Sequence, residues 1–92
     1  MRDCDPFFAH KVALVLDRLA RTHGVPNSFN LAELVLELNP PSRAGCRLEL
    51  GKLFRSADAR ALVAGRLRHC RLGAYRPSDD PRSRPHMVVD LS

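Results

Sequence analysis

With 92 residues, the chain has room for one domain, and its 45% hydrophobic and 27% charged residues are typical of a globular fold. No apolar stretch reaches the roughly 18 to 20 residues that cross a bilayer, and the amino terminus lacks the apolar segment of a secretion signal. These features exclude a membrane-spanning protein. We therefore expect a single domain, without a membrane partner, in the cytoplasm (nucleoid) or the nucleus.

The net charge of +5 is unevenly distributed. Residues 1–40 carry a net charge of −1, whereas residues 41–92 carry +6, and ten of the eleven basic residues in that second part are arginine. Arginine pairs in a planar fork with phosphates and with guanine edges. The second part of this basic protein is therefore the one that we expect to face a polyanion.

The cysteines argue against a disulfide or metal scaffold. Cys4, Cys46 and Cys70 are odd in number and form no Cys-x-x-Cys pair, so we expect reduced thiols. Of the four histidines, only His69 adjoins a cysteine, and adjacent residues on a helix point about 100° apart. The sequence predicts no metal and no cofactor.

The first predicted element is a helix over residues 6–23. Asp5 can cap it, Pro6 suits the first helical position, and Gly24 ends it. Apolar residues recur along it at helical spacing: Phe8, Val12, Val15, Leu16 and Leu19. This stripe is either part of the core or a seam through which two copies of the chain form a homodimer.

A turn at residues 25–28 leads to a second predicted helix, over residues 31–38. Asn30 can cap this helix, with Glu33 at the position that completes a capping box. The prolines that follow lack the amide that a helix needs and restrict the residue before them. We therefore expect residues 40–45 to form a loop.

Two more helices are predicted in the arginine-rich part. The third covers residues 47–55, with Leu50, Leu53 and Phe54 inward. The fourth covers residues 59–70 and carries two neighbouring stripes. One is apolar, and the other is basic and expected to face outward: Arg60, Ala64, Arg68 and Arg71.

Two extended segments follow, at residues 74–76 and 86–91, and the proline-rich stretch between them is predicted to be a hairpin loop. The predicted fold class is therefore α+β and mostly helical. We expect a winged helix, with three to four helices followed by a C-terminal β-hairpin wing over about residues 74–91, as a single domain over residues 1–92.

This order of elements predicts binding of double-stranded DNA, in transcription regulation or replication. In a helix-turn-helix the second helix enters the major groove, and a hairpin tip beside it reaches the backbone or the minor groove. The predicted nucleic-acid-binding residues lie on the fourth helix and the wing: Arg60, Arg66, Arg68, Arg71, Arg76, Arg82 and Arg84.

The wing also carries a family resemblance. The run Asp80-Pro81-Arg82-Ser83-Arg84-Pro85 and the ending Val88-Val89-Asp90-Leu91-Ser92 match the Asp-Pro-Arg-Asp-Arg-Arg-like wing and the short apolar strand of one family. The segment from Leu50 to Leu91 thus resembles the recognition helix and wing of MarR-type winged-helix transcriptional regulators. The resemblance implies that Asp80 helps to set the hairpin and that Arg82 or Arg84 approaches DNA. It covers under half of the chain. Ser83 and Pro85 depart from the family's run, and the long dimerisation helices that the family has at both ends have a counterpart only in residues 6–23.

The same residues bear on two other classes of function, protein recognition and catalysis. A winged helix can serve protein recognition, with the arginine-rich part binding an acidic partner within a larger complex. An enzyme is not expected, because the sequence has no Gly-rich phosphate loop and no nucleophile elbow. Cys70, the one thiol beside a histidine, lies on the apolar stripe of its predicted helix, where thiols are usually inert.

Overall fold

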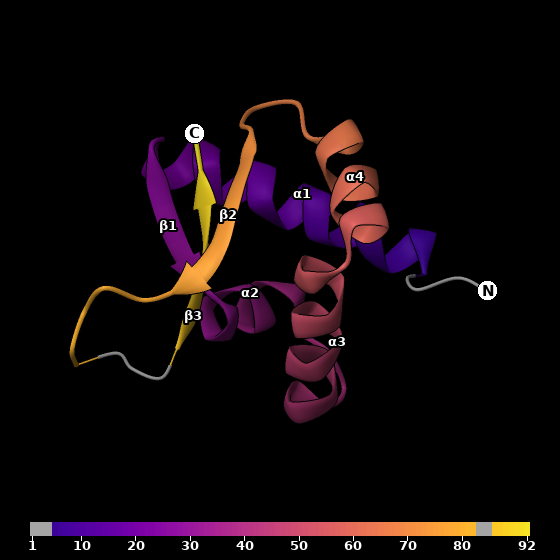
Figure 1. Cartoon of the computed structure of the whole chain (residues 1–92). Coiled ribbons are helices and arrows are strands. Elements are labelled where there is room, and N and C mark those ends of the chain that lie inside the picture. The colour runs from indigo at the N-terminus through magenta and orange to yellow at the C-terminus, as the bar shows by residue number, and fades with distance from the viewer. Residues whose placement is uncertain (1–4, 83–85) are drawn as a thin grey trace.

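The computed structural model of the chain describes residues 5–82 and 86–92. Its elements are, in order, α1 (Pro6–His23), β1 (Asn27–Asn30), α2 (Leu31–Leu38), α3 (Arg43–Arg55), α4 (Ala57–Arg66), β2 (Leu72–Pro77) and β3 (Met87–Leu91). Figure 1 shows the helices on one side of a small antiparallel sheet, with the β2–β3 hairpin extending beyond it. The predicted α+β, mostly helical class is confirmed, and the order of elements, ending in a C-terminal β-hairpin, is consistent with a winged helix. Strand β2 begins two residues before the predicted range of 74–91.

Helix α1 begins and ends where its caps predict. The side chain of Asp5 accepts a hydrogen bond of 3.0 Å from the backbone N–H of Phe7, and Gly24 ends the helix with a φ of 85°. The apolar stripe of α1 packs against α2 and α4 inside the chain. The stripe is therefore core, and the alternative that it forms a dimer seam is wrong.

Strand β1 replaces part of the turn that was expected at residues 25–28. Asn27–Asn30 pairs antiparallel with β3, and the sheet order is β1-β3-β2. Phe29 is the buried residue of this strand and lies opposite Val89. A four-residue strand with one buried apolar side chain carries almost no alternation of its own. The strand therefore forms because β3, sixty residues later in the chain, pairs with it.

Helix α2 has the predicted bounds, whereas α3 begins earlier than expected. Asn30 accepts a hydrogen bond of 2.9 Å from the N–H of Glu33 and so caps α2. Ser42 caps α3 by accepting the N–H of Gly45 at 3.1 Å, so the helix begins at Arg43 instead of residue 47. The predicted loop 40–45 is therefore wrong in its second half, and the turn between α2 and α3 spans residues 39–42.

Helix α4 ends at Arg66, four residues before the predicted end. Asp17 of α1, only 7% exposed, accepts the backbone N–H groups of Arg68 and His69 at 3.0 and 2.9 Å. Amides that donate to a carboxylate on another helix cannot also donate to the turn before them. The expected outward row of arginines on one helix is thus wrong, since Arg68 and Arg71 lie beyond the end of α4.

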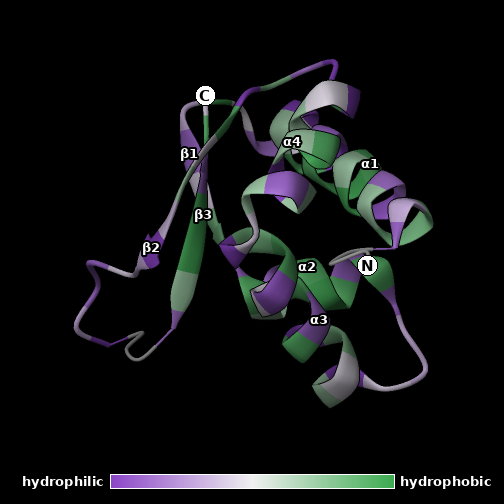
Figure 2. Ribbon diagram, turned by 45° about the vertical axis from the view of Figure 1, so that its right-hand side comes forward, coloured by the Kyte–Doolittle hydropathy of each residue, from purple (hydrophilic) through white to green (hydrophobic). Residues whose placement is uncertain are grey.

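The core joins all the helices to the sheet. Its fully buried large side chains come from every helix and from β3: Val12, Leu16, Leu34, Leu50, Leu53, Phe54, Val63, Val89 and Leu91. Figure 2 shows that hydrophobic residues dominate α2 and β3. The rings of Phe54 on α3 and Tyr75 on β2 stack with their centroids 5.6 Å apart. This contact fixes α3 relative to the base of the wing.

Candidate nucleic-acid interface

Two pairs of consecutive helices could form a helix-turn-helix, and the connections between them differ. Helices α2 and α3 are joined by the four residues 39–42, in which Asn39 adopts the left-handed conformation with a φ of 49°. Helices α3 and α4 are separated by Ser56 alone. A helix-turn-helix has a turn of three or four residues. Of the two connections, that between α2 and α3 has this length, so α3 is the candidate for the second helix of such a pair.

Helix α3 presents most of its charge to solvent. Four basic side chains on it are exposed: Arg43, Arg47, Lys52 and Arg55. The acidic residue of the helix, Glu49, lies 3.4 Å from Lys52 as an exposed ion pair. Exposed ion pairs of this kind contribute little to stability, so the lysine can exchange Glu49 for another anionic partner. The exposed surface of α3 is therefore basic, with the four charges spread around the helix.

Helix α4, which was expected to carry the basic row, presents mainly small and apolar residues. Within this fully described helix the exposed residues are Ala57, Asp58, Ala61, Leu62, Ala64, Gly65 and Arg66. Arg66 is thus its one exposed basic residue, at the last position of the helix. The side chain of Arg60 points inward and donates a hydrogen bond to the carbonyl of Gly73 on β2. Arg60 therefore links α4 to the wing.

Arg76, whose side chain is partly exposed, also pairs with residues of its own domain. Its guanidinium donates to the carboxylate of Asp90 at 2.8 and 3.0 Å and to Asp79 at 3.0 Å. Hydrogen bonds from Arg76 and Ser28 lower the pKa of Asp90. The hydrogen bond to Asp90 in turn raises the pKa of Arg76. The two residues form a cross-strand ion pair between β2 and β3, so Arg76 already has its anionic partners.

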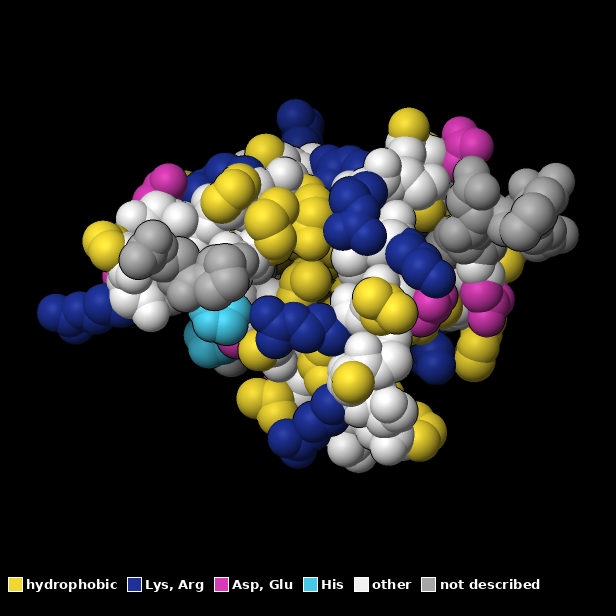
Figure 3. Space-filling model, turned by 60° about the horizontal axis from the view of Figure 1, so that its bottom comes forward, with side chains coloured by type: hydrophobic (Ala, Val, Ile, Leu, Met, Phe, Trp, Pro, Cys, Tyr) yellow, Lys and Arg dark blue, Asp and Glu magenta, His cyan; other side chains and the backbone are white. Residues whose placement is uncertain are grey.

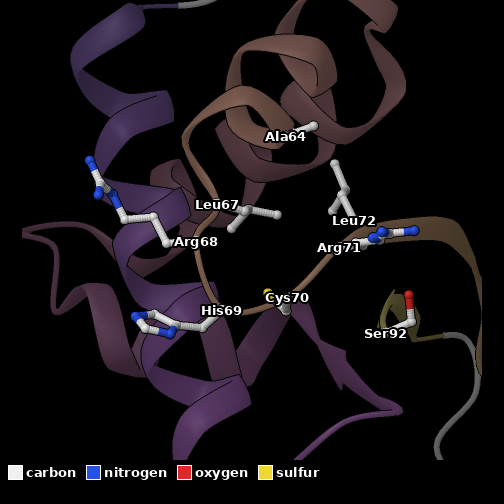
Figure 4. Close-up of a pocket in the computed structure, with 8 residues that line it drawn as sticks. All are labelled: Ala64, Leu67, Arg68, His69, Cys70, Arg71, Leu72 and Ser92. Carbon is white, nitrogen blue, oxygen red and sulfur yellow. The ribbon is translucent and has the colours of Figure 1, made fainter.

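Arg68 and Arg71 are exposed in the loop after α4, beside a hollow of about 550 Å³. Figure 4 shows that Arg68 and His69 point to one side of this hollow, whereas Arg71 lies toward Ser92 on the other. The backbone of Arg71 pairs with that of Ser92 at 2.7 and 3.1 Å and closes the hollow on that side. The charges at this hollow diverge and do not form one binding site.

The thiol of Cys70, in the same loop, has low reactivity. Burial, together with the charge of Asp17 and a hydrogen bond to it, raises the pKa of Cys70 to about 11. The sulfur is therefore a protonated thiol at neutral pH and a poor nucleophile. Among residues 5–82 and 86–92, no three His, Cys, Asp or Glu side chains come together as metal ligands.

The wing lies beside α3. The guanidinium of Arg47 is 3.2 Å from Nδ1 of His86, the residue just before β3, and donates to it in the tautomer that carries its proton on Nε2. In the hairpin loop, Asp80 accepts the backbone N–H of Arg82 at 2.9 Å, a local contact by which aspartate bends a chain. The side chain of Arg82 is exposed. Arg84 lies outside the described residues.

Comparison with known proteins identifies no relative. No family model, no curated protein and no solved structure matches the chain. The resemblance to MarR-type regulators therefore stays a prediction from the residues of the wing. No helix in the described part of the chain is long and apolar enough to span a membrane.

The site predicted from the sequence lies on α4 and the wing and does not include the four exposed basic residues of α3. The signal that could have found them is Ser42, a good N-cap directly after two prolines, which places the start of a helix at Arg43. With that start, the turn after α2 has the length of a helix-turn-helix turn. Of the seven predicted residues, the structure leaves Arg66, Arg68, Arg71 and Arg82 exposed and places Arg60 and Arg76 in internal contacts.

Proposed function

We propose that the chain binds double-stranded DNA as a winged-helix module, with α3 in the major groove and the β2–β3 wing on the neighbouring backbone. The observation that carries this proposal is the contact between Arg47 and His86, which holds the basic helix and the wing side by side. Figure 3 shows basic and apolar side chains interleaved on the face that comes forward when the bottom of the molecule in Figure 1 is turned to the viewer. A helix with an adjacent hairpin matches a major groove and the phosphates beside it.

The exposed side of α3 has residue types that suit a groove. Its first turn holds Ala44 and Gly45, whose small size lets the backbone approach the bases closely. Leu48, one turn later, is exposed and can contact a thymine methyl group, while Lys52 and Arg55 can pair with phosphates. The N-terminal part of a recognition helix is the part that reads base edges.

The proposal makes the module a binding protein without a chemical step or cofactor, acting in transcription regulation or replication at the nucleoid or in the nucleus. One module offers few base contacts, so useful sequence discrimination requires a second copy or a larger complex. The buried stripe of α1 cannot provide the dimer contact, because it is core. A homodimer would have to use another surface of the domain.

The first test is the salt dependence of duplex binding. We expect fluorescence anisotropy with a labelled duplex to show affinity that falls steeply between 50 and 200 mM salt, with a log-log slope of about −0.9 for each phosphate neutralised. The substitution Arg47→Glu should weaken binding at least about tenfold, because it replaces attraction by repulsion at the junction of α3 and the wing. Arg21→Glu, an exposed charge reversal on α1, is the matched control and should cost far less.

The same assay decides which helix meets the DNA. If α4 were the groove helix, Arg66→Glu would weaken binding more than Arg47→Glu, and the assignment to α3 would be wrong. The proposal as a whole is refuted if the unmodified chain shows no salt-sensitive binding to any duplex. Far-UV circular dichroism of each variant checks that the fold is intact.

A further inference from the structure

A small hollow opens between α2 and α3, with a volume of about 360 Å³. Its walls are mostly apolar and come from both helices: Ala32, Val35 and Leu36 from α2, and Ala44 from α3. The remaining lining residues are Arg43 and Arg47 of α3. The hollow thus combines an apolar floor, to which the core residue Val35 contributes, with two guanidinium groups, of which that of Arg47 also contacts His86.

Large apolar side chains stay uncovered at this place. Leu36, in the wall of the hollow, is 59% exposed, and Leu48, one turn after Ala44 on α3, is 61% exposed. A single exposed leucine is ordinary on a protein surface. Leu36, however, stands in the wall of an apolar hollow and gives a partner an exposed apolar contact there, whereas Leu48 does not line the hollow.

The charge around the hollow selects the kind of occupant. Among the described residues that line it, none is acidic and two are arginine. A second copy bound about a two-fold axis would bring its own Arg43 and Arg47 to the same place, and like charges in close approach oppose that pairing. An occupant that carries carboxylates beside an apolar anchor gains from both features.

We propose that this hollow binds an acidic amphipathic helix of a partner protein. The apolar face of the helix would place one side chain between α2 and α3, against Leu36 and Ala44, and its carboxylates would pair with Arg43 and Arg47. Bidentate pairing of arginine with carboxylates supplies orientation, and the apolar anchor supplies most of the affinity. The site shares Arg47 with the contact to His86, and no residue of β2 or β3 lines it.

If the chain also binds DNA, the partner helix would regulate that binding. Only this regulation, and not the peptide binding itself, rests on the proposed function. Arg47 belongs both to the hollow and to the junction of α3 with the wing. A partner helix that engages Arg47 would occupy the same charges that attract DNA. The two ligands would then compete for the domain.

The experiment is a selection of displayed helical peptides, randomised in sequence, on the immobilised chain. We expect enriched peptides that combine leucine or another large apolar residue with glutamate or aspartate on one helical face. Their affinity, measured by fluorescence anisotropy with the synthetic peptides, should fall at least about tenfold with Leu36→Asn and with Arg43→Gln. Leu14→Asn is the matched control, because Leu14 is a similarly exposed leucine on α1, 51% accessible, away from the hollow.

Several results would overturn the proposal. The first is a selection that enriches no peptide, and the second is enrichment of basic peptides. The third is binding that responds equally to Leu36→Asn and Leu14→Asn. Sedimentation equilibrium that shows a homodimer abolished by Leu36→Asn would assign the hollow to a second copy. A loss of duplex binding with Leu36→Asn as large as the loss of peptide binding would assign it to DNA. Absence of duplex binding alone leaves the peptide results to decide the proposal and refutes only the proposed function.

Discussion

At the scale of single residues, arginines of the same part of the chain have different tasks. Arg60 and Arg76 stabilise the domain, the first through the carbonyl of Gly73 and the second through Asp90. Arg47 and Arg82 are exposed on α3 and in the wing loop. The charge of +6 over residues 41–92 therefore overstates the charge that is available to a ligand.

The ion pair of Arg76 and Asp90 predicts a pH dependence of stability. Because the folded state holds the pKa of Asp90 below its ordinary value of 3.8, the unfolded chain takes up this proton more readily. The pair therefore stabilises the fold above about that pH and loses its effect as the pH falls through the lowered pKa. We expect Asp90→Asn to lower the urea midpoint at pH 7 and to change it much less near pH 2.5. An equal change at both pH values would contradict the assignment.

At the scale of elements, the end of α4 depends on a residue of α1. Asp17 receives the N–H groups of Arg68 and His69, and the loop 67–71 takes its shape from these hydrogen bonds. The chain then enters β2 at Leu72. One buried carboxylate thus sets the direction in which the wing leaves the helices.

Replacement of Asp17 by alanine leaves two amides without their acceptor in a partly buried site. We expect Asp17→Ala to lower the free energy of unfolding by about 2 to 3 kcal/mol, because hydrogen bonds to a charged group are worth more than neutral ones. Asp17→Asn keeps one oxygen acceptor and should cost less. Chemical denaturation followed by circular dichroism measures both variants, and unchanged stability in Asp17→Ala would show that the loop has another support.

Asp17 also shows where prediction from the sequence succeeds and where it fails. The starts of α1 and α2 and the end of α1 follow from Asp5, Asn30 and Gly24, whose effects act within a few residues. The end of α4 depends on a carboxylate fifty residues earlier in the chain. Strand β1 likewise depends on β3. Such partners are invisible to a reading of local patterns.

The candidate interface divides in the same way. The hairpin was predicted correctly from its turn residues, and β2 and β3 lie within two residues of the expected positions, whereas the role of the arginine-rich part stays a prediction. The sequence favoured α4, whereas the proposal made from the structure uses α3, because helical spacing alone does not reveal that Arg60 turns toward Gly73. It also does not reveal that His86 lies next to Arg47.

At the scale of the whole molecule, helices and sheet share one core. Phe54 on α3 stacks on Tyr75 of β2, and the aliphatic side chains of α1, α2 and β3 surround them in the same cluster. A domain of this size with one continuous core normally unfolds in a single cooperative step. Within residues 5–82 and 86–92, the sheet has no apolar cluster separate from this core that could keep it folded alone.

The chain has one tyrosine and no tryptophan, so its intrinsic fluorescence reports on Tyr75 alone. We expect the Tyr75 fluorescence and the far-UV circular dichroism to change at the same urea concentration. Phe54→Ala should lower the free energy of unfolding by about 3 to 5 kcal/mol, since Phe54 is only 2% exposed. A fluorescence change that precedes the loss of helix would show that the wing unfolds separately.

The position of β3 in the middle of the sheet has a consequence for biosynthesis. Strands β1 and β2 both pair with β3 and not with each other. The ribosome synthesises β1 sixty residues before β3. While the ribosome is still translating residues 31–86, Phe29 has no strand to join and its backbone stays hydrated. Strand β1 therefore cannot pair until residues 87–91 have left the exit tunnel, and until then a chaperone that shields apolar segments can bind the exposed Phe29.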